Sequence, residues 1–243
     1  MIAIETKDLF KSFGTKTAVK GIDLCVNEGE LFALLGVNGA GKTTTIRMLS
    51  CLSKPTKGDA FIFGNSVVED TSKVKRLINV SPQETAVATN LTVRENLELM
   101  ARIYGFDRSQ AERKVSQIVS EFSMEEVENS RAKTLSGGWQ RRLSIAMALI
   151  SEPKVLFLDE PTLGLDVLAR RELWKAITDI KGKVTIMLTT HYMEEAESLS
   201  DRIAVMVNGE IRALGTVDEL KERTGTGNLE EAFVTIAEGG MQK

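Results

Sequence analysis

Several features that would point to particular protein classes are scarce or missing in this chain of 243 residues. Only two cysteines occur, Cys25 and Cys51, each in an apolar-rich stretch, and we interpret them as buried thiols of a reducing compartment rather than as a disulfide or metal pair. No apolar run approaches the ~18 residues that a membrane-spanning helix needs, and the N-terminus lacks a signal-peptide profile. These absences predict a cytoplasmic protein, for which any role at a membrane would need a separate partner chain.

An excess of positive charge is also missing. The formal net charge is −3 and the pI is near 5.5, so no basic field favours nucleic acid as a partner. The apolar share of 42% and the charged share of 27% are ordinary for a globular protein. The length allows one large domain or two small ones, with enough chain for a buried core.

Short apolar runs alternate with helical patterns along most of the chain. We predict six strands, at Ile2–Ile4, Ile22–Val26, Leu31–Leu35, Val155–Leu158, Val184–Leu188 and Ile203–Val207. Helical patterns cover Thr44–Leu52, Val167–Ile180 and Met193–Leu199. Alternating strands and helices argue for an α/β protein with a mostly parallel sheet and helices on both faces, and Gly209 marks a hairpin turn.

Residues from about 84 to 150 have a different pattern, which predicts a helical insertion. Thr92-Val93-Arg94-Glu95 is a capping box that opens a helix to about Tyr104. Apolar residues then recur at helical spacing from Ser109 to Phe122, and a third helix covers Leu143–Ile150. We therefore expect a helical subdomain to interrupt the α/β framework.

Two stretches have the composition of anion-binding sites. Ser136-Gly137-Gly138 forms a loop ahead of the helix at Leu143–Ile150, where glycine lets the backbone approach an anion and unpaired N–H groups point outward. Gly36–Thr43 matches the P-loop pattern. Two anion sites in one small domain indicate a nucleotide held between two copies.

The P-loop stretch stands between a predicted strand and a predicted helix, which is the context that the motif requires. Its N–H groups would form a nest for phosphate oxygens, Lys42 would reach the terminal phosphates, and the Thr43 hydroxyl would ligate Mg²⁺. A coincidental glycine turn is the alternative interpretation. The residues expected to hold the nucleotide here are Gly36, Val37, Asn38, Gly39, Ala40, Gly41, Lys42, Thr43 and Thr44.

Two carboxylates follow the predicted strand Val155–Leu158. Asp159 stands where P-loop NTPases carry an aspartate that binds Mg²⁺, although buried strands often end in aspartate for other reasons. Glu160 would face the nucleotide and is suited to orient or deprotonate an attacking water, whereas the plain alternative is a solvated loop acid.

His191 is the only histidine of the chain and follows the apolar strand and Thr189-Thr190, at the sheet edge where α/β proteins collect ligands. A lone histidine is more often packed or exposed than catalytic, but this position favours contact with the γ-phosphate or the attacking water. Gln83 lies in the segment that connects the predicted sheet to the helical insertion. It could approach the metal and sense movement of the insertion, or be an ordinary loop residue.

Taken together and in this order, the motifs resemble those of the ATP-binding subunit of an ABC transporter, over nearly the whole chain. The matching segments are Phe13 (the aromatic that stacks on adenine), Gly36–Thr43 (Walker A), Gln83 (Q-loop, also near the metal), Leu135, Ser136, Gly137 and Gly138 (signature, against the partner's ATP), Val155–Asp159 with Glu160 (Walker B and catalytic glutamate), Leu163–Asp166 (D-loop, with Leu165 and Asp166 at the dimer contact) and His191 (switch histidine). Two departures are Trp139, where the family usually has Gln, and Phe13, where Tyr is commoner. Trp139 would either alter geometry or rate, or pack against the helix that it precedes.

The resemblance implies a P-loop NTPase core with N-terminal antiparallel strands and an inserted helical subdomain. It implies an ABC ATPase domain at 1–224, with the insertion at about 84–150, and a tail at 225–243 that starts near Gly225-Thr226-Gly227. Lys42, Glu160 and His191 would carry the hydrolysis of ATP with Mg²⁺.

The resemblance also implies partners. A second nucleotide-binding subunit, in a homodimer because every motif is present, would face this one head to tail, and a transmembrane permease would hold the pair at the inner face of the cell membrane. The stretches Asn79–Glu84 and Asn228–Phe233 resemble exporters of the multidrug, sodium or antibiotic-efflux kind. One alternative is a soluble ABC ATPase acting on ribosomes or DNA, which would carry long coiled coils, zinc modules or a second ATPase domain. Another is a P-loop kinase or metabolic enzyme, which would leave Ser136-Gly137-Gly138 unexplained. The sequence does not name the cargo.

Overall fold

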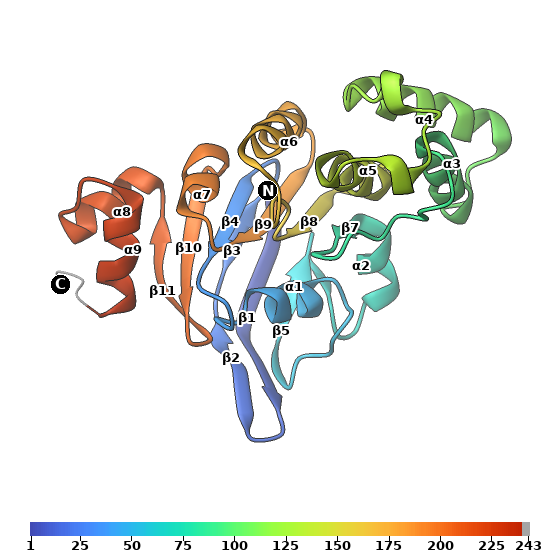
Figure 1. Cartoon of the computed structure of the whole chain (residues 1–243). Helices are drawn as coiled ribbons and strands as arrows, with labels where there is room; N and C mark the ends of the chain where they lie inside the picture. The colour runs from blue at the N-terminus through green and yellow to red at the C-terminus, as the bar shows by residue number, and fades with distance from the viewer. Residues whose placement is uncertain (240–243) are drawn as a thin grey trace.

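The computed structural model describes residues 1–239, which form two sheets and the helices around them (Figure 1). The first sheet is antiparallel and comes from the N-terminal quarter of the chain. Its strands run in the order β2-β1-β5-β6, with β3 paired to β1. Their bounds are β1 Ile2–Phe13, β2 Lys16–Ile22, β3 Cys25–Asn27, β5 Lys57–Ile62 and β6 Asn65–Ser66.

The central sheet has the order β11-β10-β4-β9-β8-β7 and is parallel except for the β10–β11 hairpin. Every residue of β4, β8 and β9 is buried, which explains why these strands read as continuous apolar runs. The bounds are β4 Leu31–Leu35, β7 Ile78–Ser81, β8 Val155–Asp159, β9 Thr185–Thr190, β10 Arg202–Val207 and β11 Glu210–Gly215.

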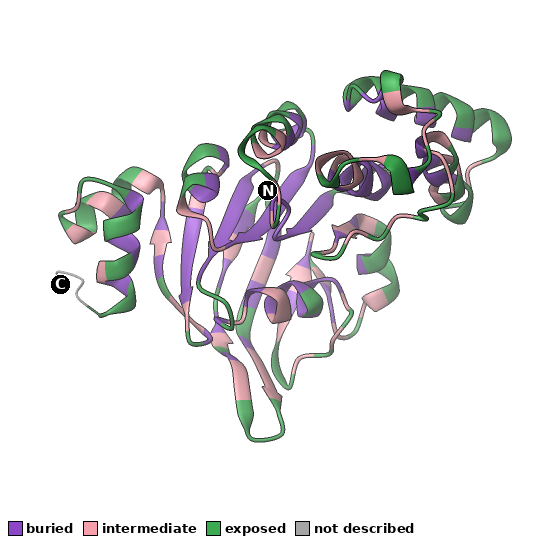
Figure 2. Ribbon diagram, in the orientation of Figure 1, coloured by how far each residue is buried: buried purple, intermediate pink, exposed green. Residues whose placement is uncertain are grey.

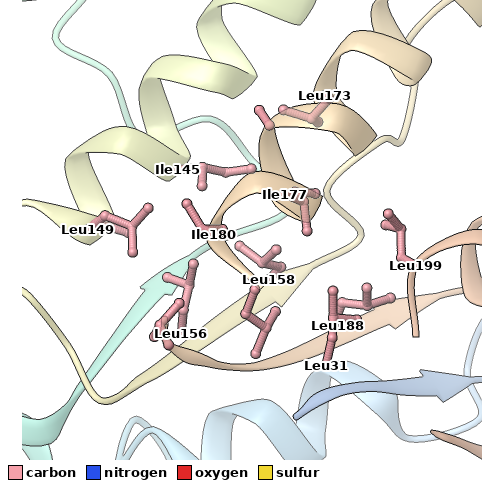
Figure 3. Close-up of a cluster of buried hydrophobic side chains, with 14 of the residues drawn as sticks. Leu31, Ile145, Leu149, Leu156, Leu158, Leu173, Ile177, Ile180, Leu188 and Leu199 are labelled. Carbon is pink, nitrogen blue, oxygen red and sulfur yellow. The ribbon is translucent and has the colours of Figure 1, made fainter. Parts of the chain in front are cut away.

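Two hydrophobic cores lie on opposite faces of the central sheet. Leu31, Ala33 and Leu35 of β4 belong to one core, and Phe32 and Leu34 belong to the other, because successive side chains of a strand point to opposite faces. The first core continues into the helices that cover this face, as the leucines and isoleucines in Figure 3 show. The buried strands run through the middle of the molecule, with exposed residues on its rim (Figure 2).

The helices divide into those of the framework and those of the insertion. The framework helices are α1 Lys42–Leu49, α2 Thr71–Leu77, α6 Val167–Ile180, α7 Met193–Leu199, α8 Val217–Thr224 and α9 Leu229–Ala237. The insertion contains α3 Val93–Ile103, α4 Arg108–Glu121 and α5 Gly137–Leu149, and α3 and α4 lie at the opposite end of the molecule from α8 and α9 (Figure 1). The predicted capping box is confirmed, since Thr92 and Glu95 accept from each other's backbone N–H.

Three expectations about local structure were wrong. Ile22–Val26 is not one strand: the Thr6 hydroxyl donates to the Ile22 carbonyl and accepts from the Leu24 N–H, both at 2.8 Å, where β2 ends before β3. The glycines of the signature do not form a loop, because Ser136 caps a helix that already begins at Gly137. Both cysteines are free, as expected, but they are half-buried rather than buried.

The C-terminal residues are held by side-chain burial. Gly225 ends α8 in the left-handed conformation (φ 66°), and the Asn228 side chain caps α9 by accepting from the Glu231 N–H. Leu229 and Ile236 are buried against the framework. The boundary predicted between a domain at 1–224 and a tail at 225–243 stays a prediction, and its last four residues lie outside the described part of the chain.

Candidate active site

The P-loop joins the end of β4 to α1, and two of its glycines are required by their surroundings. The Gly36 N–H donates to the Thr190 carbonyl at 3.2 Å, and a Cβ atom on Gly36 would lie 2.4 Å from the Met206 carbonyl oxygen. Gly41 has a φ of 112°, which L side chains rarely adopt. The backbone therefore runs against β10 and leaves Asn38 and Gly39 exposed above it.

Lys42 begins α1 and is almost completely buried. Its ammonium donates to the carbonyl oxygens of Gly36 at 2.7 Å and Val37 at 3.3 Å, and it lies 3.0 Å from Oε1 of Glu160. A buried charge is tolerated only with partners of this kind. The cation is thus fixed beneath the loop whose N–H groups would meet phosphate oxygens.

Asp159, at the end of β8, shares hydrogen bonds with two threonines. Its Oδ1 accepts from the Thr43 hydroxyl at 3.1 Å and from the Thr189 hydroxyl at 2.6 Å. The Thr43 hydroxyl and the Asp159 carboxylate are hard oxygen donors, which fits the Mg²⁺ site that the sequence predicts. Thr189 was not among the predicted site residues, because its place between the predicted strand and His191 does not reveal a hydrogen bond to Asp159.

Glu160 follows directly and has an unusual backbone. Its φ is 50°, an uncommon conformation for a residue other than glycine. The Glu160 N–H donates to the carbonyl and the hydroxyl oxygen of Thr189, both at 3.1 Å, and these bonds hold the turn. The resulting turn places the carboxylate between Lys42 and His191, whose Nδ1 lies 2.5 Å from Oε2.

These residues meet because parallel strands end at one edge of the sheet. Leu35 of β4 pairs with Thr190 of β9, and Asp159 of β8 pairs with Thr189. The segments that leave these strand ends are the P-loop, the Glu160 turn and the His191 loop. The fold therefore brings together residues that lie more than a hundred positions apart in the sequence.

A cavity of about 450 Å³ opens above this edge. Phe13, whose side chain is 55% exposed, lines it together with Gln83 from the loop after β7. The predicted site residues among its lining are Phe13, Asn38, Gly39, Gly41, Lys42, Thr43, Thr44, Gln83, Glu160 and His191. Leu163, the first residue of the D-loop, also lines the cavity. Within the described part of the chain, the cavity wall includes neither the signature residues (Leu135, Ser136, Gly137 and Gly138) nor Leu165 and Asp166.

The signature lies at the surface, at the N-terminus of α5. Ser136 and Gly137 are exposed, and the Ser136 side chain accepts from the Trp139 N–H. Gly138 packs so tightly on α6 that a Cβ atom there would lie 2.9 Å from Cβ of Ala169. Trp139 is half-buried in the first turn of α5, and the Arg142 guanidinium lies 4.5 Å from its ring.

The D-loop lies next to the signature in the same chain. A Cβ atom on Gly137 would lie 3.7 Å from Cδ2 of Leu165. Asp166 caps α6 by accepting from the N–H groups of Leu168 and Ala169 at 3.0 and 2.9 Å. Signature and D-loop therefore form one continuous exposed surface at the ends of α5 and α6.

Glu195 is a second buried carboxyl group near the site that sequence reasoning missed. It is 1% exposed on α7, and its Oε1 accepts from Nε1 of Trp174 at 3.2 Å. Burial raises the pKa of the Glu195 carboxyl, and the charge of Glu160 acts in the same direction. Its sequence context, a helix start rich in acids, carries no signal of burial.

A P-loop between a buried strand and a helix, with a carboxylate pair at the end of another parallel strand of the same sheet, defines the class of P-loop nucleoside triphosphatases. Comparison with known protein families gives the finer assignment. The family model described as "ABC transporter" matches residues 19–163, and the chain belongs to this family.

Two curated relatives illustrate the range of lengths in the family. The daunorubicin/doxorubicin resistance ATP-binding protein DrrA of Streptomyces peucetius is 41% identical over 228 residues, which are 93% of this chain and 69% of that protein. Human phospholipid-transporting ATPase ABCA3 is 42% identical over 228 residues, which are 92% of this chain and 13% of that protein. The chain therefore spans most of DrrA and a small part of the much longer human relative.

Two solved structures share the fold. One, described as the ATP-binding subunit of an ABC transporter, has a TM-score of 0.84 at 31% identity and covers 96% of this chain and 99% of its own. The other is a dimeric post-hydrolysis state of the ATP-binding cassette MJ0796 bound to ADP and Pi, with a TM-score of 0.78 at 25% identity over 88% of this chain and 98% of that one. These likenesses confirm the predicted fold class. As a member of this family, the protein binds ATP with Mg²⁺ and hydrolyses it.

Proposed function

We propose that the chain energises export through a separate transmembrane partner, by closing on ATP as a head-to-tail dimer. The observation that carries this proposal is the separation of the two anion sites. The P-loop lines the cavity, while Ser136 and Gly137 are exposed on another surface of the same chain. A second subunit can supply its signature to this cavity and receive the signature of this one.

Apolar side chains around both sites support a second subunit as the occupant. Val37 in the P-loop is 53% exposed, and Val167 and Leu168 beside the D-loop are 61% and 73% exposed. Exposed apolar groups beside the polar signature are suited to an interface that forms and opens. The dimeric state of the MJ0796 cassette supports the same arrangement.

Within each site we assign the following roles. Phe13 stacks on the adenine ring, the P-loop N–H groups and Lys42 bind the phosphates, and the oxygens of Thr43, Asp159 and Gln83 hold Mg²⁺. Bound Mg²⁺ would neutralise charge on the β- and γ-phosphate oxygens. Glu160 orients or deprotonates the attacking water, and His191 fixes Oε2 of Glu160 and contacts the γ-phosphate.

A surface of α3 supports the transmembrane partner. Leu99 and Ile103 are neighbours on this helix at i and i+4, and they are 43% and 65% exposed beside Tyr104 at 42%. Among the described residues, the structure contains no helix long and apolar enough to cross a membrane. We propose that the α3 surface (Leu99, Ile103 and Tyr104) binds a permease at the inner face of the cell membrane, and the relative DrrA, named for drug resistance, favours export.

Size-exclusion chromatography with Glu160→Gln tests the dimer. This variant keeps the volume of the side chain but removes the base, so millimolar ATP should shift it to a dimer, and nucleotide-free protein should remain a monomer. Adding Ser136→Glu places a negative charge against the partner's phosphate and should abolish the shift. A Glu160→Gln variant that stays monomeric in ATP, while wild type hydrolyses ATP, would contradict the proposal.

A pull-down of the tagged chain from native membranes in detergent tests the partner. A polytopic protein at comparable stoichiometry supports the transporter. Ribosomal or DNA-bound proteins alone would favour the alternative of a soluble ABC ATPase.

A further inference from the structure

Helix α5, which begins with the signature, runs beside β7, which leads into Gln83. The hydroxyl of Ser144 lies 3.0 Å from that of Ser81, and the Asn79 amide donates to the Ser151 hydroxyl just beyond the helix at 3.2 Å. Ser144 lies within α5, and Ser151 follows the end of the helix at Leu149. The face of α5 that carries Ser144 therefore lies against β7, the strand that precedes Gln83.

Arg141 extends the same face of α5 beyond the end of β7. Its Nη1 donates to the Pro82 carbonyl at 2.7 Å, and its Nη2 donates to the Gln83 carbonyl. The guanidinium fork thus holds two successive carbonyl oxygens at the point where the strand becomes a loop. A planar group with fixed donors can fix such a pair, whereas a single ammonium cannot fix it with the same geometry.

The environment of Arg141 is unusual for a cation. The residue is 5% exposed, and burial lowers the pKa of its guanidinium. Among the described residues, no carboxylate forms a salt bridge with it; its hydrogen bonds go to the two carbonyls. Burying a charged group costs free energy, and here hydrogen bonds to the Pro82 and Gln83 carbonyls offset part of that cost.

Gln83 itself is exposed at its side chain and lines the nucleotide cavity. A strand at the edge of the sheet, as β7 is, fixes the backbone from one side only. Position 83 lies beyond the last paired residue, Ser81, and the Arg141 fork is the contact that ties its carbonyl to α5. Displacement of α5 would therefore move Gln83 relative to the cavity.

We infer that Arg141 is a positioning residue, which holds Gln83 at the nucleotide and makes Gln83 and the signature end of α5 move as one body. The inference rests on the proposed contact of Gln83 with the nucleotide and its metal. It adds a mechanical link inside one subunit. The link joins Gln83, which contacts that subunit's own nucleotide, to the signature at the start of α5, which contacts the nucleotide of the partner.

The neighbouring Arg142 is a matched control, because it points elsewhere. Its guanidinium stacks on Trp139, and its Nη1 donates to the Phe122 carbonyl at 3.2 Å, within the helical insertion. Arg141→Met and Arg142→Met remove the same charge from consecutive positions of one helix. Only the first removes the tie to the Gln83 loop.

A double-mutant cycle of ATPase rates tests the link. Gln83→Ala and Arg141→Met should each lower kcat roughly tenfold or more, because small misplacements of a positioning group have effects of that size. The double variant should be no slower than the slower single variant, since Arg141 acts on the rate through the position of the Gln83 side chain, which Gln83→Ala already removes. Arg142→Met combined with Gln83→Ala should instead show the product of its two single effects. Arg141→Lys should restore part of the rate.

Hydrogen–deuterium exchange of the loop separates this inference from the proposed function. In Arg141→Met, the amides from 83 to 91 should exchange faster, while Arg142→Met should leave them unchanged. Urea unfolding confirms that both variants are folded. If Gln83→Ala alone leaves kcat unchanged, the proposed role of Gln83 fails, and exchange then decides whether the tie exists. Unchanged exchange in Arg141→Met, or multiplicative effects in its cycle with Gln83→Ala, would overturn the inference.

Discussion

The Nζ atom of Lys42 lies 3.0 Å from Oε1 of Glu160, and the two side chains are 4% and 6% exposed. The other carboxylate oxygen of Glu160 contacts His191, and its backbone N–H is held by Thr189. The carboxylate is therefore held from several sides in the folded chain. A group fixed in this way needs little reorganisation when a water molecule approaches, and such preorganisation is how active sites stabilise a transition state.

Thr189→Val should weaken the response to Mg²⁺. The substitution keeps the shape of the side chain but removes the hydrogen bond to Oδ1 of Asp159 and an acceptor for the Glu160 N–H. Loss of a group that orients a metal ligand typically costs about 10- to 100-fold in metal affinity or activity. The Mg²⁺ concentration for half-maximal ATPase activity should rise accordingly. Thr185→Val is the control, because Thr185 lies at the far end of the same strand, where its hydroxyl accepts from the Gly29 N–H. An equal shift in both variants would contradict the role of Thr189.

Gly138→Ala should destabilise the protein through a clash with α6. The added methyl would lie 2.9 Å from Cβ of Ala169, so one helix must move. Overpacking of this kind costs about 1–3 kcal/mol, which exceeds the gain of roughly 0.5–1 kcal/mol from replacing a helical glycine. Urea unfolding measures the loss. Ala169→Gly in the same chain removes the clash and should recover part of the stability, and no recovery would mean that the cost arises elsewhere.

The stability of the Glu195→Gln variant relative to wild type should increase as the pH rises. Because burial raises the pKa of Glu195, the folded state binds its proton over a range where the unfolded state has released it, so the free energy of unfolding falls with rising pH. This loss begins at the ordinary glutamate pKa and ends at the raised one, and glutamine does not undergo it. Urea unfolding of both proteins from roughly pH 5 to 8 should show a widening difference in favour of the variant. A difference that is independent of pH would refute the prediction.

Ile103→Glu should separate the membrane partner from the ATPase activity. Ile103 is 65% exposed on α3 and is not among the residues that line the nucleotide cavity, so folding and basal hydrolysis should be retained. A charge in the apolar α3 surface should reduce co-purification with the transmembrane partner at least tenfold, which corresponds to about 1.4 kcal/mol. Glu98→Gln, on the same helix, is the control for a general effect of surface charge. Retained co-purification would remove α3 from the proposed interface.

Much of the framework could be predicted because its signals are local. Continuous apolar runs marked β4, β8 and β9, since both faces of these strands are buried. The helix predicted at Val167–Ile180 is α6 with the same bounds, because Asp166 caps it directly before an amphipathic pattern. The short α2 was not predicted, since its seven residues bury only one side chain.

The remainder of the candidate site depends on contacts between distant segments. Thr189 orients Asp159 across 30 positions, and Arg141 reaches Gln83 across 58. Neither residue belongs to a pattern that sequence spacing can reveal, because each acts through a neighbour that only the folded sheet provides. Glu195 likewise accepts a hydrogen bond from Trp174 on another helix, 21 positions away.

The contact between His191 and Glu160 has a practical consequence. Because the chain contains one histidine, its imidazole is a built-in reporter that needs no assignment by mutagenesis. In protein labelled with ¹⁵N-histidine, every imidazole resonance would arise beside the Glu160 carboxylate. Its tautomer and protonation could then be followed through nucleotide binding, dimer closure and phosphate release in a single spectrum.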